Sequence, residues 1–211
     1  MAQAAKEQLA TASYWNNVYR QPPTGSKPTH EWYSIQDIAG FLETHLYPTK
    51  PSSTSPRILH LGSGDSVVPA EFYEKGYTDQ ICMDFSRVVV EKMRRAHANK
   101  PGIQWLEGDV RIMADIPDAS VDVAFDKGTL DAMTYENSWH PPPPVVRNAE
   151  QYVNQVARVL KPGGIFLCIT FQPVYFIKRY LVREGVWQTT SETLVREGGS
   201  IGYQGFVMKK P

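Results

Sequence analysis

The sequence has little that would point to a nucleic-acid, membrane or extracellular role. Its 22 Lys and Arg residues are balanced by 22 Asp and Glu residues, so the formal net charge is zero. Without a long basic run, neither nucleic acid nor a membrane surface is expected as the main partner. No apolar run approaches the length of a membrane span, and residues 1–12 lack the apolar core of a signal peptide. We therefore expect a cytoplasmic protein.

Cysteine is equally scarce. Cys82 and Cys168 both lie in apolar, strand-like runs, which predicts buried free thiols in a reducing compartment. Two cysteines without clustered histidines do not make a zinc site, so no metal is predicted. The phosphate-binding run Gly-x-x-x-x-Gly-Lys-Ser/Thr is also absent, and nothing indicates a triphosphate ligand.

What the chain does have is an enzyme-like body. Its 211 residues, 42% apolar and 21% charged, are enough for a stable core. Beyond Arg57, strand and helix patterns alternate, which predicts a Rossmann-like, doubly wound seven-stranded α/β sheet, mostly parallel, with an antiparallel final strand. The strands are expected over residues 57–61, 80–83, 103–107, 121–125, 165–170, 186–194 and 202–208.

Two segments stand apart from this alternation. Residues 1–56 are expected to form a helical extension, with helices over 5–20 and 31–46, that contributes to the cofactor site of a domain over 57–211. Tyr135 to Asn148, with four prolines at 141–144, is expected to be an exposed loop. It follows the fourth strand, so it should lie over the substrate side of the sheet.

The most informative motif is Leu59-His60-Leu61-Gly62-Ser63-Gly64, followed 20 residues after Gly64 by Asp84. This pattern predicts a strand, a glycine turn, a helix and a second strand that ends in a carboxylate. Gly62 and Gly64 allow the backbone to pass close to a ligand, and Asp84 can accept hydrogen bonds from two ribose hydroxyls. This pattern predicts a site for a nucleoside cofactor.

The identity of that cofactor follows from a missing glycine. A dinucleotide fingerprint has a third glycine three residues after the second, where this chain has Val67. A pyrophosphate is therefore disfavoured. A cofactor with a ribose and no phosphate fits better, and S-adenosylmethionine is the common one, with S-adenosylhomocysteine as its product.

Four acidic residues, Asp65, Asp84, Asp109 and Asp126, fall at or just after expected strand ends. Taken singly, each is more often a helix cap or turn residue. As a series they predict a site in which Asp84 binds the ribose and Asp109, with Val110, meets the adenine. Asp126 then lies nearest the reacting end.

Lys127 and three aromatic residues have two interpretations each. Lys127 could form a surface pair with Asp126 or Asp131, or could contact the cofactor, which we favour. Trp15, Tyr19 and Trp32 could tie the extension to the body, or could wall in a sulfonium cofactor. Both roles of the aromatic residues are compatible.

These motifs resemble the seven-β-strand, class I S-adenosylmethionine-dependent methyltransferases. The resemblance narrows to a branch that methylates lysine on translation elongation factor 1-alpha, and it spans Tyr14 to Met208. It rests on the glycine turn, on residues 83–86, 108–110 and 158–164, on the run from Asp126 to Ala132, on Val88-Val89-Val90, and on Tyr14-Trp15 with Tyr19.

The resemblance implies cofactor contacts at matching positions, and the sequence leaves the oligomeric state open. The implied contacts are Trp15, Tyr19, Trp32, Gly62, Asp84, Phe85, Asp109, Val110 and Lys127. Two departures stand out. Gly62-Ser63-Gly64-Asp65 replaces the family's frequent Gly-Cys-Gly-Asn, and the loop around Pro141 to Pro144 has no counterpart. Asn-Pro-Pro-Tyr is absent after the fourth strand, which disfavours glutamine and adenine as acceptors.

The expected function is therefore methyl transfer to a protein lysine, most directly on elongation factor 1-alpha. Asp126 and Asp131 are the candidate catalytic residues that would orient the acceptor amine, a hypothesis from position alone. Two alternatives remain: a small-molecule methyltransferase on the same fold, or a catalytically silent cofactor-binding module that presents the proline loop to a partner.

Overall fold

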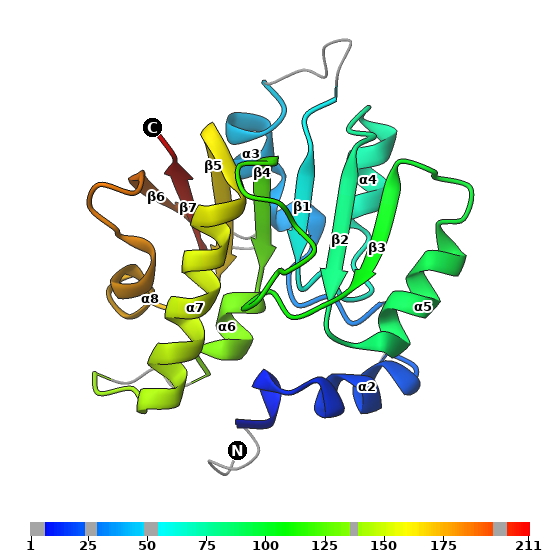
Figure 1. The fold of residues 1–211 in the computed structure, drawn as a ribbon, viewed down its shortest axis with the longest axis horizontal. Helices are drawn as coiled ribbons and strands as arrows, with labels where there is room; N and C mark the ends of the chain where they lie inside the picture. Colours follow the sequence, from blue (N-terminus) through cyan, green and yellow to red (C-terminus); the bar gives the residue numbers. More distant parts are fainter. Residues whose placement is uncertain (1–6, 24–28, 49–54, 136–138, 196–201) are drawn as a thin grey trace.

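The protein folds around a central seven-stranded sheet (Figure 1). The computed structural model describes residues 7–23, 29–48, 55–135, 139–195 and 202–211. The strand order is β3-β2-β1-β4-β5-β7-β6. The strands are β1 (Ile58–Leu61), β2 (Gln80–Asp84), β3 (Ile103–Glu107), β4 (Val121–Lys127), β5 (Leu160–Thr170), β6 (Gln188–Leu194) and β7 (Tyr203–Lys209).

The first five strands are parallel, and both faces of the central ones are covered. Every residue of β1 and β2 is buried, as expected for a parallel sheet between two layers of helices. β7 runs antiparallel between β5 and β6. The predicted fold class, including the antiparallel final strands, is confirmed.

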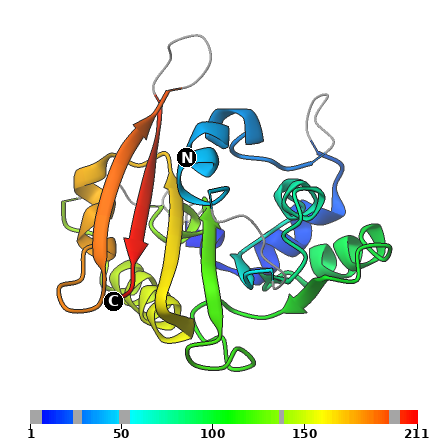
Figure 2. The same cartoon turned by 90° about the horizontal axis from the view of Figure 1, so that it is seen from above.

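Helices cover the sheet on two sides (Figure 2). α3 (Ile35–His45), α4 (Val68–Glu74) and α5 (Arg87–Ala96) pack on one face, with cores around Phe72 and Val89. α7 (Pro143–Val159) and α8 (Val174–Leu181) pack on the other. Among the described residues no helix is both long and apolar enough to cross a bilayer.

The site is positioned by a reversal of strand order. β1 pairs with β2 on one side and with β4 on the other, so the helices that follow β1 and β4 leave the sheet in opposite directions. A crevice opens there, at the carboxyl ends of the strands. The short helices η1 (Gln8–Ala10) and α2 (Ala12–Arg20) cross that edge from α6 (Thr129–Met133) to α5 (Figure 1).

Several predicted boundaries were wrong. The expected helix over residues 5–20 is interrupted at Thr11, whose backbone is extended, between η1 and α2. The expected loop over residues 135–148 becomes helical at Pro143, because prolines at the first helical positions lack only an N–H that has no partner there. The expected second helix over residues 31–46 begins only at Ile35, after the Ser34 cap, so residues 31–34 lie outside the observed helix. β5 begins at Leu160, because residues 161–164 form an irregularity within the strand. Residues 136–138 of the expected loop lie outside the described residues.

Candidate cofactor site

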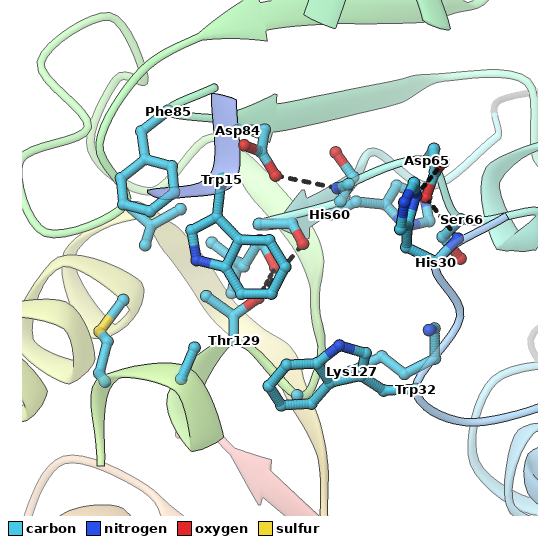
Figure 3. Close-up of a pocket in the computed structure, with 18 of the residues that line it drawn as sticks. Trp15, His30, Trp32, His60, Asp65, Ser66, Asp84, Phe85, Lys127 and Thr129 are labelled. Carbon is cyan, nitrogen blue, oxygen red and sulfur yellow. Dashed lines mark hydrogen bonds and ion pairs between the residues drawn. The ribbon is translucent and has the colours of Figure 1, made fainter. Parts of the chain in front are cut away.

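A cavity of about 960 Å³, including its open mouth, lies at the carboxyl edge of the sheet over β1 and β4 (Figure 3). All ten predicted cofactor-binding residues line it: Trp15, Tyr19, Trp32, Gly62, Gly64, Asp84, Phe85, Asp109, Val110 and Lys127. The structure therefore brings this predicted set together, from six separate parts of the chain.

The glycine turn forms one wall. Gly62 and Gly64 have φ angles of +62° and +53°, a region that disfavours side chains. A Cβ at Gly64 would lie 2.6 Å from the hydroxyl oxygen of Tyr19, and one at Gly62 would overlap the hydroxyl of Thr129. The turn requires glycine for both its conformation and its close packing.

Asp84 ends β2 and faces the cavity. Its carboxylate accepts hydrogen bonds from the backbone N–H of Gly64 at 2.9 Å and of Ser86 at 2.8 Å. Burial raises its pKa to about 6, although these two bonds favour the charged form. An ionised carboxylate can accept about four hydrogen bonds. Two sites therefore remain for vicinal hydroxyls such as those of a ribose.

Asp109 and Val110 follow β3 on the neighbouring wall. The Asp109 carboxylate holds the Arg111 guanidinium in a two-pronged ion pair, with Arg111 Nη2 at 2.6 Å from Asp109 Oδ2. Burial opposes ionisation, but this pairing outweighs it and keeps the pKa of Asp109 below its usual value. Asp109 is thus a fixed acceptor at the cavity, and Val110 supplies buried apolar surface beside it.

Residues 30–32 form a strap across the cavity, and Glu31 fastens it. The Glu31 carboxylate pairs with Lys127 at the end of β4. Its Oε1 also accepts from the Ser66 hydroxyl at 2.7 Å and from the Val67 N–H at 2.8 Å, where α4 begins. Lys127 and Glu31 are only 9% and 13% exposed. One buried carboxylate therefore joins the extension, the glycine turn and β4.

His30 fastens the same strap to the other side. Its N–H and Nδ1 both lie 2.9 Å from the Asp65 carboxylate, which also accepts from Lys92 Nζ at 3.0 Å. Burial would raise the pKa of Asp65, but the bonds from His30 and Lys92 outweigh it and hold the pKa below its usual value. Asp65 is a structural junction between strap, turn and α5.

An aromatic wall formed by Trp15, Tyr19 and Trp32 covers the cavity. Trp15 lies 5.7 Å from Tyr19 and 5.8 Å from Trp32, centroid to centroid, and Trp32 lies 6.3 Å from Phe171, which follows β5. The Trp15 indole N–H donates to the Leu9 carbonyl at 2.8 Å, so it holds the extension and is not directed at a ligand. These aromatic residues pack against one another within the extension, and they also line the cavity.

Lys127 pairs with neither acidic residue considered from the sequence. Its ammonium contacts Glu31 and lies 5.8 Å from the Tyr33 ring, while its side chain lines the cavity. The surface-pair interpretation is wrong, because Glu31 approaches from a distant part of the chain and covers it.

Asp126 and Asp131, the candidate catalytic residues, do not line the cavity. Asp126 is fully buried and accepts from the N–H groups of Thr129 and Leu130 and from the Tyr152 hydroxyl at 2.7, 3.0 and 2.8 Å. Asp131 is bonded to the hydroxyls of Tyr33 and Thr170. The structure thus gives no support for direct contact between either carboxylate and an acceptor. Both hold the backbone behind the site, a positioning role.

Several lining residues were not anticipated from the sequence, namely His30, Glu31, Arg111, Thr129 and Met133. Glu31 directly precedes Trp32, which was predicted to line the site. That neighbour was the only feature of the sequence that could have indicated a place for Glu31 in the site. Thr129 lies in the run after β4 and donates to the Leu61 carbonyl at 2.7 Å. These contacts join residues far apart in sequence, where no spacing rule applies.

Comparison with known proteins agrees with this geometry. Residues 59–168 match the family described as a methyltransferase domain. EEF1A lysine methyltransferase 4 of Mus musculus is 32% identical over 88% of this chain and 71% of its own length. The chain belongs to the methyltransferase family. The predicted family and its cofactor, S-adenosylmethionine, are thereby confirmed.

Other relatives of this methyltransferase are longer. The eEF1A lysine and N-terminal methyltransferase of Homo sapiens is 28% identical over 86% of the chain but only 25% of its own length. The chain thus spans about a quarter of that relative. Among solved structures, the 1,6-didemethyltoxoflavin-N1-methyltransferase of Burkholderia thailandensis, bound to S-adenosylhomocysteine, matches the whole chain with a TM-score of 0.66 at 14% identity, covering 91% of that structure. At this identity the likeness concerns the fold.

The residues present fit S-adenosylmethionine. Asp84 has two acceptor sites left for ribose hydroxyls, and Asp109 also lines the cavity. The aromatic wall offers faces that attract a positively charged sulfur. Among the described residues that line the cavity, the Lys and Arg side chains, Lys127 and Arg111, are each paired with a carboxylate and so do not form a phosphate cradle.

Replacing Glu31 tests the strap. Glu31→Gln leaves the buried Lys127 ammonium without its anion, so the strap should detach more readily and S-adenosylmethionine should bind roughly tenfold more weakly. Isothermal titration calorimetry measures this. Glu91→Gln, which removes an exposed partner of Arg87 on α5, is the matched control and should bind like the wild type. Equal affinities for both variants would contradict the role of Glu31.

Asp126 gives a pH-dependent prediction. Burial raises its pKa to about 7, so between about pH 4 and pH 7 the folded protein binds more protons than the unfolded chain. Stability from this group is therefore lost as pH rises through that window. Asp126→Asn removes the titration, so its stability relative to wild type should improve by on the order of 3 kcal/mol from pH 4 to pH 8. Urea unfolding at several pH values measures the difference. A pH-independent difference would show that Asp126 ionises normally.

Proposed function

We propose that this protein transfers a methyl group from S-adenosylmethionine to a lysine side chain of translation elongation factor 1-alpha. The names of the relatives support the acceptor: the mouse protein that is 32% identical is an EEF1A lysine methyltransferase. A Bos taurus relative with the same name is 36% identical over 79% of the chain and 63% of its own length. Six further relatives carry names that also refer to eEF1A.

The observation that carries the proposal is the aromatic path from the cavity to the surface. Trp32 lines the cavity and is 40% exposed, and it adjoins Phe171, which is 50% exposed. A lysine side chain has a long aliphatic stem and a cationic end, both of which pack well on aromatic faces. The cavity thus opens toward a surface that a protein side chain can enter, which favours a protein acceptor over an enclosed metabolite.

The cofactor, when bound, supplies a methyl group on a positively charged sulfur. The chain's own residues hold the reacting groups and exclude water. Trp15, Trp32 and the strap fastened by Glu31 and His30 cover the cavity. A fixed, dry geometry contributes most to a displacement of this kind, because little other chemistry is required of the protein.

The acceptor lysine must lose a proton before it can react. Its unperturbed pKa is about 10.4, and transfer into an apolar environment lowers the pKa of an ammonium group. Trp32 and Phe171 provide such an environment. Of the lining carboxylates, Asp84 is assigned to the ribose, and Glu31, Asp65 and Asp109 are already paired with cations. Desolvation by the aromatic wall is therefore the main contribution that the lining residues offer to deprotonation.

Methylation of the purified factor tests the proposal. Wild-type protein with labelled S-adenosylmethionine and elongation factor 1-alpha from cells lacking the enzyme should label the factor at one lysine, identified by mass spectrometry. Substitution of that lysine by arginine should abolish the label. Asp84→Asn, which weakens the ribose acceptor, should reduce the rate at low cofactor concentration by at least about tenfold.

The same assay separates the alternatives. In a cytosolic extract, label confined to small molecules would replace the proposal with a metabolite methyltransferase. Absence of any transfer despite measurable cofactor binding would favour a silent binding module.

A further inference from the structure

An exposed aromatic cluster lies beside the mouth of the cofactor site. Trp139 stacks on Tyr175, with ring centroids 5.3 Å apart and planes at 13°, and its edge contacts Phe176 at 5.3 Å. Trp139 is 67% exposed and Tyr175 is 55% exposed. We call Trp139, Tyr175 and Phe176 the aromatic cluster. Large aromatic side chains grouped in this way on a surface mark an interaction site more often than a solvated one.

The cluster is built into the fold. Tyr175 and Phe176 lie in the first turn of α8, directly after the carboxyl end of β5, while Trp139 precedes α7. The Arg179 guanidinium donates to the Trp139 carbonyl at 3.3 Å and so links the two segments. The proline-rich segment before α7 therefore contributes Trp139 to this face.

The charge around the cluster is positive on balance. Residues 139–150 and 171–184, which carry the cluster, contain Arg147, Lys178, Arg179 and Arg183 against Glu150 and Glu184. Lys178 and Arg179 are exposed on α8. The whole chain is neutral, so this local excess is compensated elsewhere. Such a face attracts an acidic surface and repels a basic one.

The segment that carries Tyr175 and Phe176 begins at the wall of the cavity. Phe171 lies 6.3 Å from Trp32, which lines the cavity. A protein whose lysine entered along Trp32 would bring its neighbouring residues over Phe171 and onto α8. The surface is therefore placed where an acceptor protein must make contact outside the cavity.

We infer that the aromatic cluster, with Lys178 and Arg179, is the docking surface for the acceptor protein, and that it binds an acidic segment beside the target lysine. This inference rests on the proposed function. Aromatic residues and arginine dominate binding energy at protein interfaces, which gives the cluster its anchoring role. The basic residues then select an acceptor lysine by the acidic residues around it.

Steady-state methylation of elongation factor 1-alpha tests the inference with two double variants. Lys178→Glu with Arg179→Glu, and Trp139→Ala with Tyr175→Ala, should each raise the KM for the factor by about tenfold or more, with kcat within about twofold. Their Kd for S-adenosylmethionine should match the wild type, because none of the four side chains lines the cofactor cavity. The KM of the wild type should rise with salt concentration, and the KM of the charge variant should not.

A matched control separates local from general charge effects. Lys75→Glu with Arg95→Glu makes the same change in net charge, at exposed positions on and beside helices of the opposite face. Its KM should stay within about twofold of the wild type. Circular dichroism and thermal melting establish that all variants fold.

The outcomes are distinguishable. A wild-type enzyme that methylates the factor, with both cluster variants unchanged in KM, would overturn the docking surface and leave the proposed function intact. A wild-type enzyme that neither binds nor methylates the factor would overturn both. If sedimentation showed a wild-type dimer that the cluster variants dissociate, the occupant would be a second copy of the chain, and the inference would also fail.

Discussion

The buried carboxylate of Glu31 is the contact on which the site depends. A bare crevice at the carboxyl edge of a parallel sheet is open to water on one side. Glu31 closes it by binding Lys127 at the end of β4 and the amide and hydroxyl groups at the start of α4. Breaking a buried pair of this kind leaves an uncompensated charge, which is strongly unfavourable. The strap and its aromatic residues are consequently part of the lining of the cavity.

The strap also determines which chemistry is favoured. Trp15 is held by the bond from its N–H to the Leu9 carbonyl, and Trp32 packs against Trp15, so both rings are fixed at the cavity. Asp84 is fixed by two backbone donors and faces inward. Together these groups provide hydroxyl recognition, cation attraction and exclusion of water. They provide no charged phosphate cradle, in agreement with a nucleoside sulfonium cofactor.

Much of the fold and of the cofactor site could be predicted from sequence. Apolar runs separated by turn residues give the strands directly, and the glycine turn followed by Asp84 is a local pattern with fixed spacing. The start of α7 was missed because four prolines suggest a loop, although prolines fit a helix's first turn. Glu31 was missed because its partners lie 35 to 96 residues away. Only the tertiary fold brings them together.

The candidate catalytic residues illustrate a different limit. Along β4 successive side chains point to opposite sides, so Phe125 and Lys127 line the cavity while Asp126 turns toward α6 and α7. Its position at a strand end was predicted correctly, but the direction of its side chain was not considered. Strand alternation could have indicated this, since Asp126 lies between two residues of one face.

The central claim is that the strap-covered cavity holds an adenosyl sulfonium. A crystal structure of the protein with S-adenosylhomocysteine tests it most directly. We expect the ribose hydroxyls to donate hydrogen bonds to Asp84. The adenine should lie beside Asp109 and Val110, and the sulfur should lie against Trp15 and Trp32. Density for the ligand at another place, with Asp84 and the glycine turn uncontacted, would contradict it.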